Sequence, residues 1–326
     1  MSVFIRSRVM ARPMAWGTYM LRSSLVSAFI RSRVMALENP FRFEMMQQTP
    51  GNPTTVNREH RHGAKNLQLR IGLYLLGFIF LLMIAFSLSR GLSININMDR
   101  QLEPSSAKYL LGTDELGRDL ISSVVYGAGI SMLISLTVVI LSSLIGAVMG
   151  MISGFAGGIV DTIIMRIVDI ILAFPGILLA IALASFFYPG IFTLILVLIV
   201  PNWVGCARIV RGEVLKFKQK EFILAAKSYN ASFFRIIFHH MLPLVLPLIV
   251  VQASLDIAGV ILAESSLNFL GIGLDPEVPT LGQLVDAGRD HLFSRPELSI
   301  VPGAALFFVI IAFNFIAEGL RRKFTR

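Results

Sequence analysis

The sequence is poor in charged residues and in cysteine, and both shortages narrow the class of protein. Charged residues make up 15% of the chain, whereas a soluble domain carries about 25%. Hydrophobic residues make up 55% and fall in long blocks, several of which reach the roughly 20 residues that a helix needs to cross a bilayer core. These features exclude a water-soluble globule and predict an all-α integral membrane protein.

Ligands for metals are scarce as well. The one cysteine, Cys206, excludes an internal disulfide and a cysteine-rich metal site, and we interpret it as a small buried side chain. The histidines include two close pairs, His60 with His62 and His239 with His240, but neither has carboxylates or cysteines at metal-ligand spacing. We therefore predict no metal and no cofactor in this chain.

A phosphate-binding loop is also missing from the sequence. No stretch reads Gly-x-x-x-x-Gly-Lys-Ser/Thr, the loop whose backbone amides hold the phosphates of ATP. An intramembrane enzyme would need a nucleophile with a base, or a His/Asp metal motif, and the apolar blocks contain no histidine. We therefore predict a protein without catalytic activity of its own.

The net charge of +9 is distributed in a way that argues against nucleic acid as a partner. Of the 29 Lys and Arg residues, eleven precede residue 71, seven lie between Arg208 and Arg235, and four follow Leu320. Each group borders an apolar block, as cytoplasmic loops of membrane proteins do. The basic residues therefore indicate orientation in a membrane.

Six apolar blocks predict six membrane-spanning helices. Pro175 and Pro201 interrupt two of them, and kinks are expected there because proline breaks the helical hydrogen-bond ladder. The acidic segment 264–299 is expected outside, and the alternation of basic and acidic loops predicts that both termini are cytoplasmic. The predicted spans cover about residues 71–88, 125–153, 163–187, 191–209, 241–263 and 300–316.

The chain divides at about residue 66. Residues 1–66 are predicted to form a flexible cytoplasmic extension, and residues 67–326 the transmembrane domain. The octapeptide Phe4–Ala11 recurs unchanged as Phe29–Ala36. A recent duplication or a start codon placed too far upstream explains this repeat, and a basic amphipathic helix lying on anionic lipid is the functional alternative.

Three stretches of sequence resemble one family, the second-permease subunits of dipeptide, oligopeptide and nickel ATP-binding-cassette importers. The resemblance covers about residues 67–326. It is carried by Leu111–Asp119 (LGTDELGRD) with Tyr126–Ser131 (YGAGIS), by Met165–Asp169 (MRIVD) with Ala173–Gly176 (AFPG), and by Glu264–Gly273 (ESSLNFLGIG) with Ala312–Asn314 (AFN) and Glu318–Arg321 (EGLR).

The resemblance implies a type I ABC importer permease fold that forms half of a pathway for di- or oligopeptides across a bacterial inner membrane. The implied partners are a second homologous permease, two ATPase subunits that bind ATP and Mg, an extracytoplasmic substrate-binding protein and membrane lipid. Nickel, glutathione or another small solute remain alternative substrates. An ion-coupled secondary transporter is the alternative class, and it would favour an inverted repeat that the spans do not show.

Such permeases carry a cytoplasmic loop that reads Glu-Ala-Ala, then Gly, then Leu-Pro. We expect a helix over about residues 220–228, whose small alanine pair lets it seat in a cleft of an ATPase subunit. Asn occupies the usual glycine position and is the next best residue for a left-handed turn. The predicted coupling residues are Glu221, Ala225, Ala226, Asn230, Ala231 and Pro243.

Charged residues inside the predicted spans are functional candidates. Arg166 and Asp169 lie three residues apart, so they either form a structural ion pair or line the translocation path. Asp256 either faces a water-filled cavity on that path or hydrogen-bonds Gln252 one turn back. Glu264 is expected at the outer interface, where the fifth span ends.

The outer segment that follows contains several glycines and prolines, which suit an irregular surface better than a tight hairpin. We expect it to dock the substrate-binding protein. The predicted contact residues are Gly271, Gly273, Leu274, Pro276 and Val278.

Overall fold

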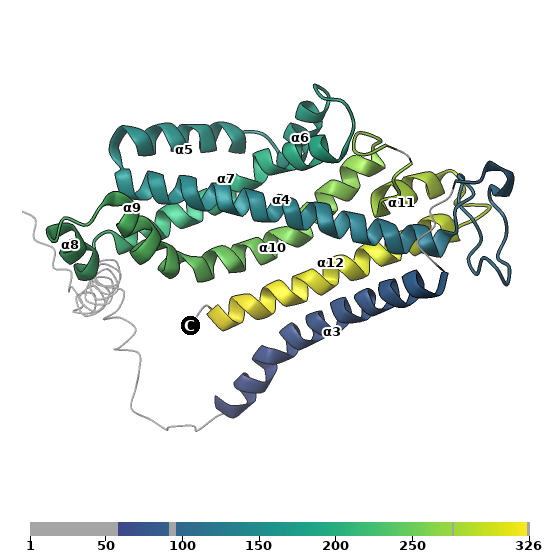
Figure 1. Cartoon of the computed structure of the whole chain (residues 1–326), viewed down its shortest axis with the longest axis horizontal. Coiled ribbons are helices and arrows are strands. Elements are labelled where there is room, and N and C mark those ends of the chain that lie inside the picture. The colour runs from purple at the N-terminus through teal and green to yellow at the C-terminus, as the bar shows by residue number, and fades with distance from the viewer. Residues whose placement is uncertain (1–57, 91–95, 276, 325–326) are drawn as a thin grey trace, which may run out of the picture. The chain divides into compact units, whose positions relative to one another are not determined.

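The computed structural model describes residues 58–90, 96–275 and 277–324, and its regular elements are helices (Figure 1). The predicted all-α architecture is confirmed for these residues. The elements are α3 (Arg58–Arg90), the short 3-10 helix η1 (Met98–Arg100), α4 (Leu120–Ala156), α5 (Gly158–Leu172), α6 (Gly176–Ala184), α7 (Ile191–Phe217), α8 (Glu221–Ser228), α9 (Phe233–Arg235), the π-helix η2 (Ile236–Met241), α10 (Leu242–Phe269), α11 (Leu281–Arg289) and α12 (Glu297–Phe324).

Helices α4 and α7 pack closely because α4 presents glycines at every fourth position. A Cβ atom on Gly146 would lie 2.5 Å from the carbonyl oxygen of Trp203, and one on Gly150 would lie 2.5 Å from that of Ala207. Gly154 continues the same stripe. Small residues let two backbones approach inside a membrane, where helix association depends on packing. The two helices form the centre of the bundle (Figure 1).

The third predicted span is two helices and not one kinked helix. Helices α5 and α6 meet at an angle of 88°. Pro175 caps α6 with an extended backbone, and proline also disfavours helical geometry at the residue before it, here Phe174. The prediction of one continuous helix over residues 163–187 is therefore wrong.

Among the described residues, four helices are long and apolar enough to cross a membrane, namely α4, α7, α12 and the continuous run from α9 to α10. The bent pair α5–α6 raises the number to five if it counts as one span. The first predicted span lies in α3, whose described apolar stretch, Leu67–Leu82, is shorter. Helix α3 begins at Arg58, inside the predicted extension, and the duplicated octapeptides lie outside the described residues.

The two ends of the bundle differ in construction (Figure 1). Helices α8 and α9 project at one end, where the loop after α7 turns back into α10. Helix α11 and the loop 96–119 lie at the opposite end, beside the start of α4 and the end of α10. The charge pattern of the loops predicts that the first end faces the cytoplasm.

Candidate functional site

Helix α8 is held to the bundle by a small part of its surface. Ile223 is fully buried, and Ala226 is partly buried against the same cluster of apolar side chains, which includes Val214 and Met241. The remaining side chains that the structure describes in this helix are exposed, among them Glu221, Phe222, Leu224, Ala225 and Ser228. The helix therefore leaves most of its surface exposed at this end of the bundle.

The turn after α8 follows the prediction. Asn230 has a φ of 57°, which is the left-handed conformation expected where the family has glycine. The backbone N–H of Ala231 donates to the carbonyl oxygen of Ala226, and the Ser232 side chain accepts from the N–H of Arg235. The chain thus reverses between two short helices within four residues.

The two alanines of the pair, Ala225 and Ala226, differ in burial. Ala225 is exposed, whereas Ala226 and Ala231 pack inward against the cluster that holds α8. Ala225 is therefore the more accessible of the two, and the expectation that both alanines seat against a partner stays a prediction. Glu221 lies in the first turn of α8, where the helix dipole favours a carboxylate. Pro243 lies exposed in the first turn of α10.

Near the same end, an ion pair fastens α5 to α7. The guanidinium of Arg211 donates through Nε and Nη2 to the two carboxylate oxygens of Asp161, at 2.5 and 2.6 Å. The Ser153 hydroxyl of α4 donates to the same carboxylate. Bidentate pairs of this kind fix orientation as well as distance. The residues are 50 positions apart, so their spacing in the sequence gave no sign of the contact.

The three charges predicted inside spans have different surroundings. Arg166 and Asp169 are both exposed on α5, and the ion pairs of the described residues do not include one between them. Asp256 is half-buried and accepts a hydrogen bond of 2.8 Å from Nε2 of Gln252, as one of the two alternatives proposed.

Glu264 lies inside the bundle and not at its outer surface. Helix α10 continues to Phe269, and the Glu264 side chain is fully buried. Its carboxylate accepts from Nδ2 of Asn268 at 2.5 Å and from the Ser265 hydroxyl at 3.1 Å. Asn268 Oδ1 accepts in turn from the N–H of Leu274 at 2.9 Å. The helix continues past this charge to Phe269 and supplies its hydrogen-bond partners, whereas the position of Glu264 at the outer membrane interface stays a prediction.

The motif LGTDELGRD lies in the loop 96–119, at the end of the bundle opposite α8. Asp114 accepts from the backbone N–H of Leu116 and of Arg118, and it forms a buried ion pair of 2.7 Å with Nε of Arg118. The Nη1 atom of Arg118 donates to the carbonyl oxygen of Glu277 at 3.1 Å. The motif therefore fixes its own loop and also holds the segment that follows α10.

Two further contacts join the same segments. His291 Nε2 lies 2.8 Å from a carboxylate oxygen of Glu115. Arg295 donates to the carbonyl oxygens of Leu102 and Glu103, at 2.6 and 3.1 Å. We call the loop 96–119 together with the described residues of 270–296 the outer platform. The hydrogen bonds and ion pairs that join its two parts were not predicted, although the Asp114–Arg118 spacing of four residues is typical of an ion pair.

The predicted docking residues fall into three groups. Gly271 is exposed and has a φ of 70°. Leu274 is 4% exposed and packs in the main core with Val278 against it, so Leu274 is not available to a partner, contrary to the prediction. Gly273 is buried, and its lack of a Cβ atom leaves room for the Asn268 side chain. Pro276 lies outside the described residues.

The outer platform contains a charged cleft of about 460 Å³. The carboxylates that line it are more numerous than the two arginines, Arg118 and Arg289, so the cleft has an excess of negative charge. These carboxylates belong to Asp114, Glu115, Asp275, Asp286 and Asp290.

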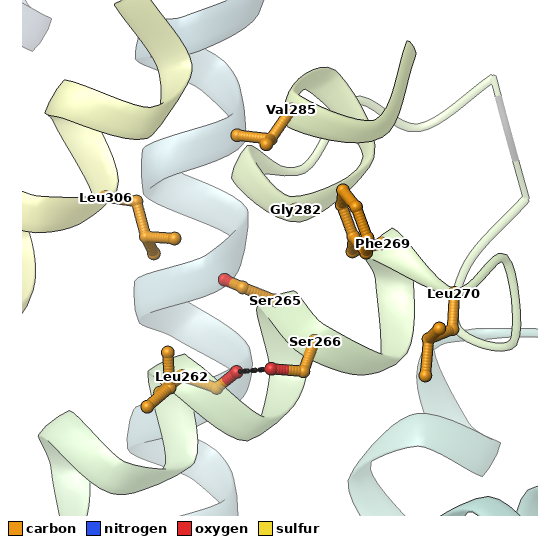
Figure 2. A pocket seen from close by; sticks show the side chains of 8 residues that line it. All are labelled: Leu262, Ser265, Ser266, Phe269, Leu270, Gly282, Val285 and Leu306. Carbon is orange, nitrogen blue, oxygen red and sulfur yellow. Dashed lines mark hydrogen bonds between the residues drawn. The ribbon is translucent and has the colours of Figure 1, made fainter. Parts of the chain in front are cut away.

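A second hollow, of about 300 Å³, lies between α10, α11 and α12 (Figure 2). Leu262, Phe269, Val285 and Leu306 supply apolar walls, and the Ser266 hydroxyl donates to the carbonyl oxygen of Leu262 within its own helix. No charged side chain lines this hollow among the described residues, so it offers little to a polar solute.

Residues 146–326 match the model of the family described as "Binding-protein-dependent transport system inner membrane component". The matched region runs from the glycine stripe of α4 through α12, so it contains α8 and the 270–296 part of the outer platform but not the loop 96–119. The chain belongs to this family. As a member, it is a permease subunit of an inner-membrane transport system, and the family's subunits are not the catalytic ones.

The permease is also similar to curated proteins over most of its length. It is 36% identical over 259 residues to the dipeptide transport system permease protein DppC of Bacillus subtilis, covering 79% of this chain and 81% of that one. The corresponding DppC of Alkalihalophilus pseudofirmus is 36% identical over 258 residues, 79% and 85% of the two chains. The glutathione transport system permease protein GsiD of Pectobacterium atrosepticum is 37% identical over 223 residues, 68% and 74% of the two chains.

Proposed function

We propose that this permease forms half of the translocation pathway of an ATP-driven importer of di- or oligopeptides. Its relatives named for dipeptide transport support the substrate class. In this arrangement the chain crosses the membrane six times, with α3 as the first span, α5–α6 as one broken span and both termini in the cytoplasm. Two ATPase subunits, a second homologous permease and an extracytoplasmic binding protein complete the transporter.

The observation that carries the proposal is the exposed surface of α8. A helix that holds to its own chain through Ile223 and Ala226 leaves Phe222, Leu224 and Ala225 open at the cytoplasmic end. Apolar side chains in such a position are typical of a contact surface. Because the sequence lacks a phosphate-binding loop, the energy for transport has to arrive through a partner, and α8 is the proposed coupling element.

The outer platform is the proposed docking surface for the binding protein. Gly271 remains a candidate contact residue. The exposed Asp275 and Glu277 are further candidates, in place of the buried Leu274. The negative charge of the cleft favours a basic patch on the docking protein, since complementary charge steers association. Asp256, half-buried on α10, remains a candidate for the translocation path.

Uptake by the reconstituted complex tests this function. The complex is purified through a tag on this chain and placed in lipid vesicles with ATP inside and the binding protein outside. We expect accumulation of a labelled dipeptide that depends on ATP and on the binding protein. Uptake driven by an ion gradient without ATP would contradict the proposal.

Glutathione is the second candidate substrate, because one relative is named for its transport. The same vesicles distinguish the two. A peptide importer takes up labelled dipeptide in the presence of excess glutathione, whereas a glutathione importer shows the reverse preference.

A further inference from the structure

The helix that enters the bundle after the turn at Asn230 changes its hydrogen-bond pattern on the way. The run from α9 to α10 is continuous, yet its segment η2 (Ile236–Met241) is a π-helix. There the N–H of Leu242 donates to the carbonyl oxygen of Ile237, five residues back instead of the four of an α-helix. A π turn therefore holds one residue more than an α turn. Such turns are rare, and inside α-helices they occur frequently at functional sites.

Two prolines next to η2 explain why this stretch departs from the α pattern. Pro243 and Pro247 lie in the first two turns of α10. Proline has no backbone N–H, so the carbonyl oxygen four residues before each one lacks its α-helical donor. For Pro243 that oxygen belongs to His239, inside η2. Because the α pattern also leaves a bond unmade here, the π pattern costs less than it would in an ordinary helix.

Helix α8 is fastened to this π-helix. The fully buried Ile223 of α8 packs in one apolar cluster with the buried side chains of η2, namely Ile236, Ile237 and Met241. On another side of η2, the Phe238 side chain is 55% exposed. The π-helix is thus bound on one side to the proposed coupling helix, and its exposed side leaves it room to change.

We propose that η2 is the joint through which a movement of α8 reaches α10, by a change between the π and the α pattern. The inference rests on the proposed function, which assigns the coupling role to α8. Conversion of the π turn to an α turn lengthens the helix by about one residue, or about 1.5 Å along its axis. Helices at subunit interfaces shift by about 1–2 Å in switching transitions, so a step of this size is one that packed helices can follow. Asp256, a candidate for the translocation path, lies on α10 and moves with it.

Deletion of His239 tests the joint, because it removes one exposed residue from η2 and shortens the π turn to the length of an α turn. In the reconstituted complex we expect ATP hydrolysis with the ATPase subunits still bound, but at least a tenfold fall in the labelled dipeptide taken up per ATP. His239→Ala is the control, since it changes the side chain and keeps the residue count, and it should leave this ratio unchanged. An unchanged ratio in the deletion variant would overturn the proposal.

Hydrogen exchange in the unaltered complex gives a test that does not depend on the folding of the deletion variant. The backbone amides of residues 237–242 should exchange at rates that differ at least tenfold between the nucleotide-free complex and the complex with a non-hydrolysable ATP analogue. The amides of residues 146–154 in α4 are the control and should exchange equally in both states. Equal exchange of the η2 amides in the two states would overturn the proposal. Failure of the proposed function is a separate outcome, since the unaltered complex would then show no ATP-dependent uptake.

Discussion

Asn268 joins the end of α10 to the segment that follows it, and it does so with both ends of its amide. Nδ2 donates to the buried Glu264, and Oδ1 accepts from the N–H of Leu274. A Cβ atom at Gly273 would lie 1.8 Å from that Oδ1, so the glycine is required by the contact. The motif ESSLNFLGIG thus fixes the end of α10 against the segment that follows it through hydrogen bonds.

Asn268→Ala should destabilise the purified complex more than Asn202→Ala does. Removal of the amide leaves the buried Glu264 carboxylate and the Leu274 N–H each without one partner, at a cost of about 1–3 kcal/mol for each unsatisfied group. We expect a clear fall in the thermal unfolding midpoint. Asn202→Ala is the matched control, because its amide donates to a carbonyl oxygen within its own helix. Equal midpoints for the two variants would contradict this role.

At the scale of single elements, the turn between α8 and α9 depends on one backbone conformation. Asn230 adopts a left-handed φ, which costs most residues roughly 1–2 kcal/mol and costs glycine nothing. Asn230→Gly should therefore retain substrate-stimulated ATP hydrolysis in the reconstituted complex, and Asn230→Val should lower it. A variant with valine that keeps full stimulation would show that the turn does not transmit motion.

The elements also show which features the sequence could predict. The apolar blocks correctly indicated the long helices α4, α7, α10 and α12, because helix length follows from local composition. They did not distinguish a kink from a break at Pro175, since both satisfy proline and only tertiary packing selects between them. The end of α10 was placed before Glu264 because a carboxylate usually marks an interface, and here Asn268 and Ser265 compensate for its burial.

Contacts between distant residues lay beyond local patterns. The Asp161–Arg211 clamp and the Arg118 contact with Glu277 join positions 50 and 159 residues apart. Similarly, the exposed side of α8 could not be assigned from the alanine pair alone. Only the packing of Ile223 shows that Ala225, and not Ala226, faces outward.

For the whole molecule, the topology is the first quantity to measure. A reporter enzyme that is active only outside the cytoplasm, fused after Arg326, should give no signal. The same reporter inserted at Ala107, in the exposed outer loop, should be active. The basic residues at the end of α12 are the physical reason, because they resist transfer across the membrane. Full activity of the fusion after Arg326 would reverse the assignment of the two ends.

The extension before the transmembrane domain should be dispensable for transport. Residues 2–44 contain the duplicated octapeptide and none of the motifs that carry the family resemblance. Their deletion should leave peptide uptake near that of the complete chain. Loss of uptake at a normal membrane level would instead assign a regulatory or lipid-binding role to this segment.

The coupling role of α8 is the central claim, and Ala225→Asp tests it most directly. The substitution puts a charge on the exposed face of α8 without disturbing the inward packing of Ala226. An unpaired charge buried in the ATPase contact would cost roughly 2–5 kcal/mol, which weakens binding tens- to thousands-fold. We predict normal membrane insertion with loss of the ATPase subunits from the purified complex, whereas Ala107→Asp in the outer loop keeps them. Unchanged recovery of the ATPases and unchanged uptake with Ala225→Asp would contradict the account.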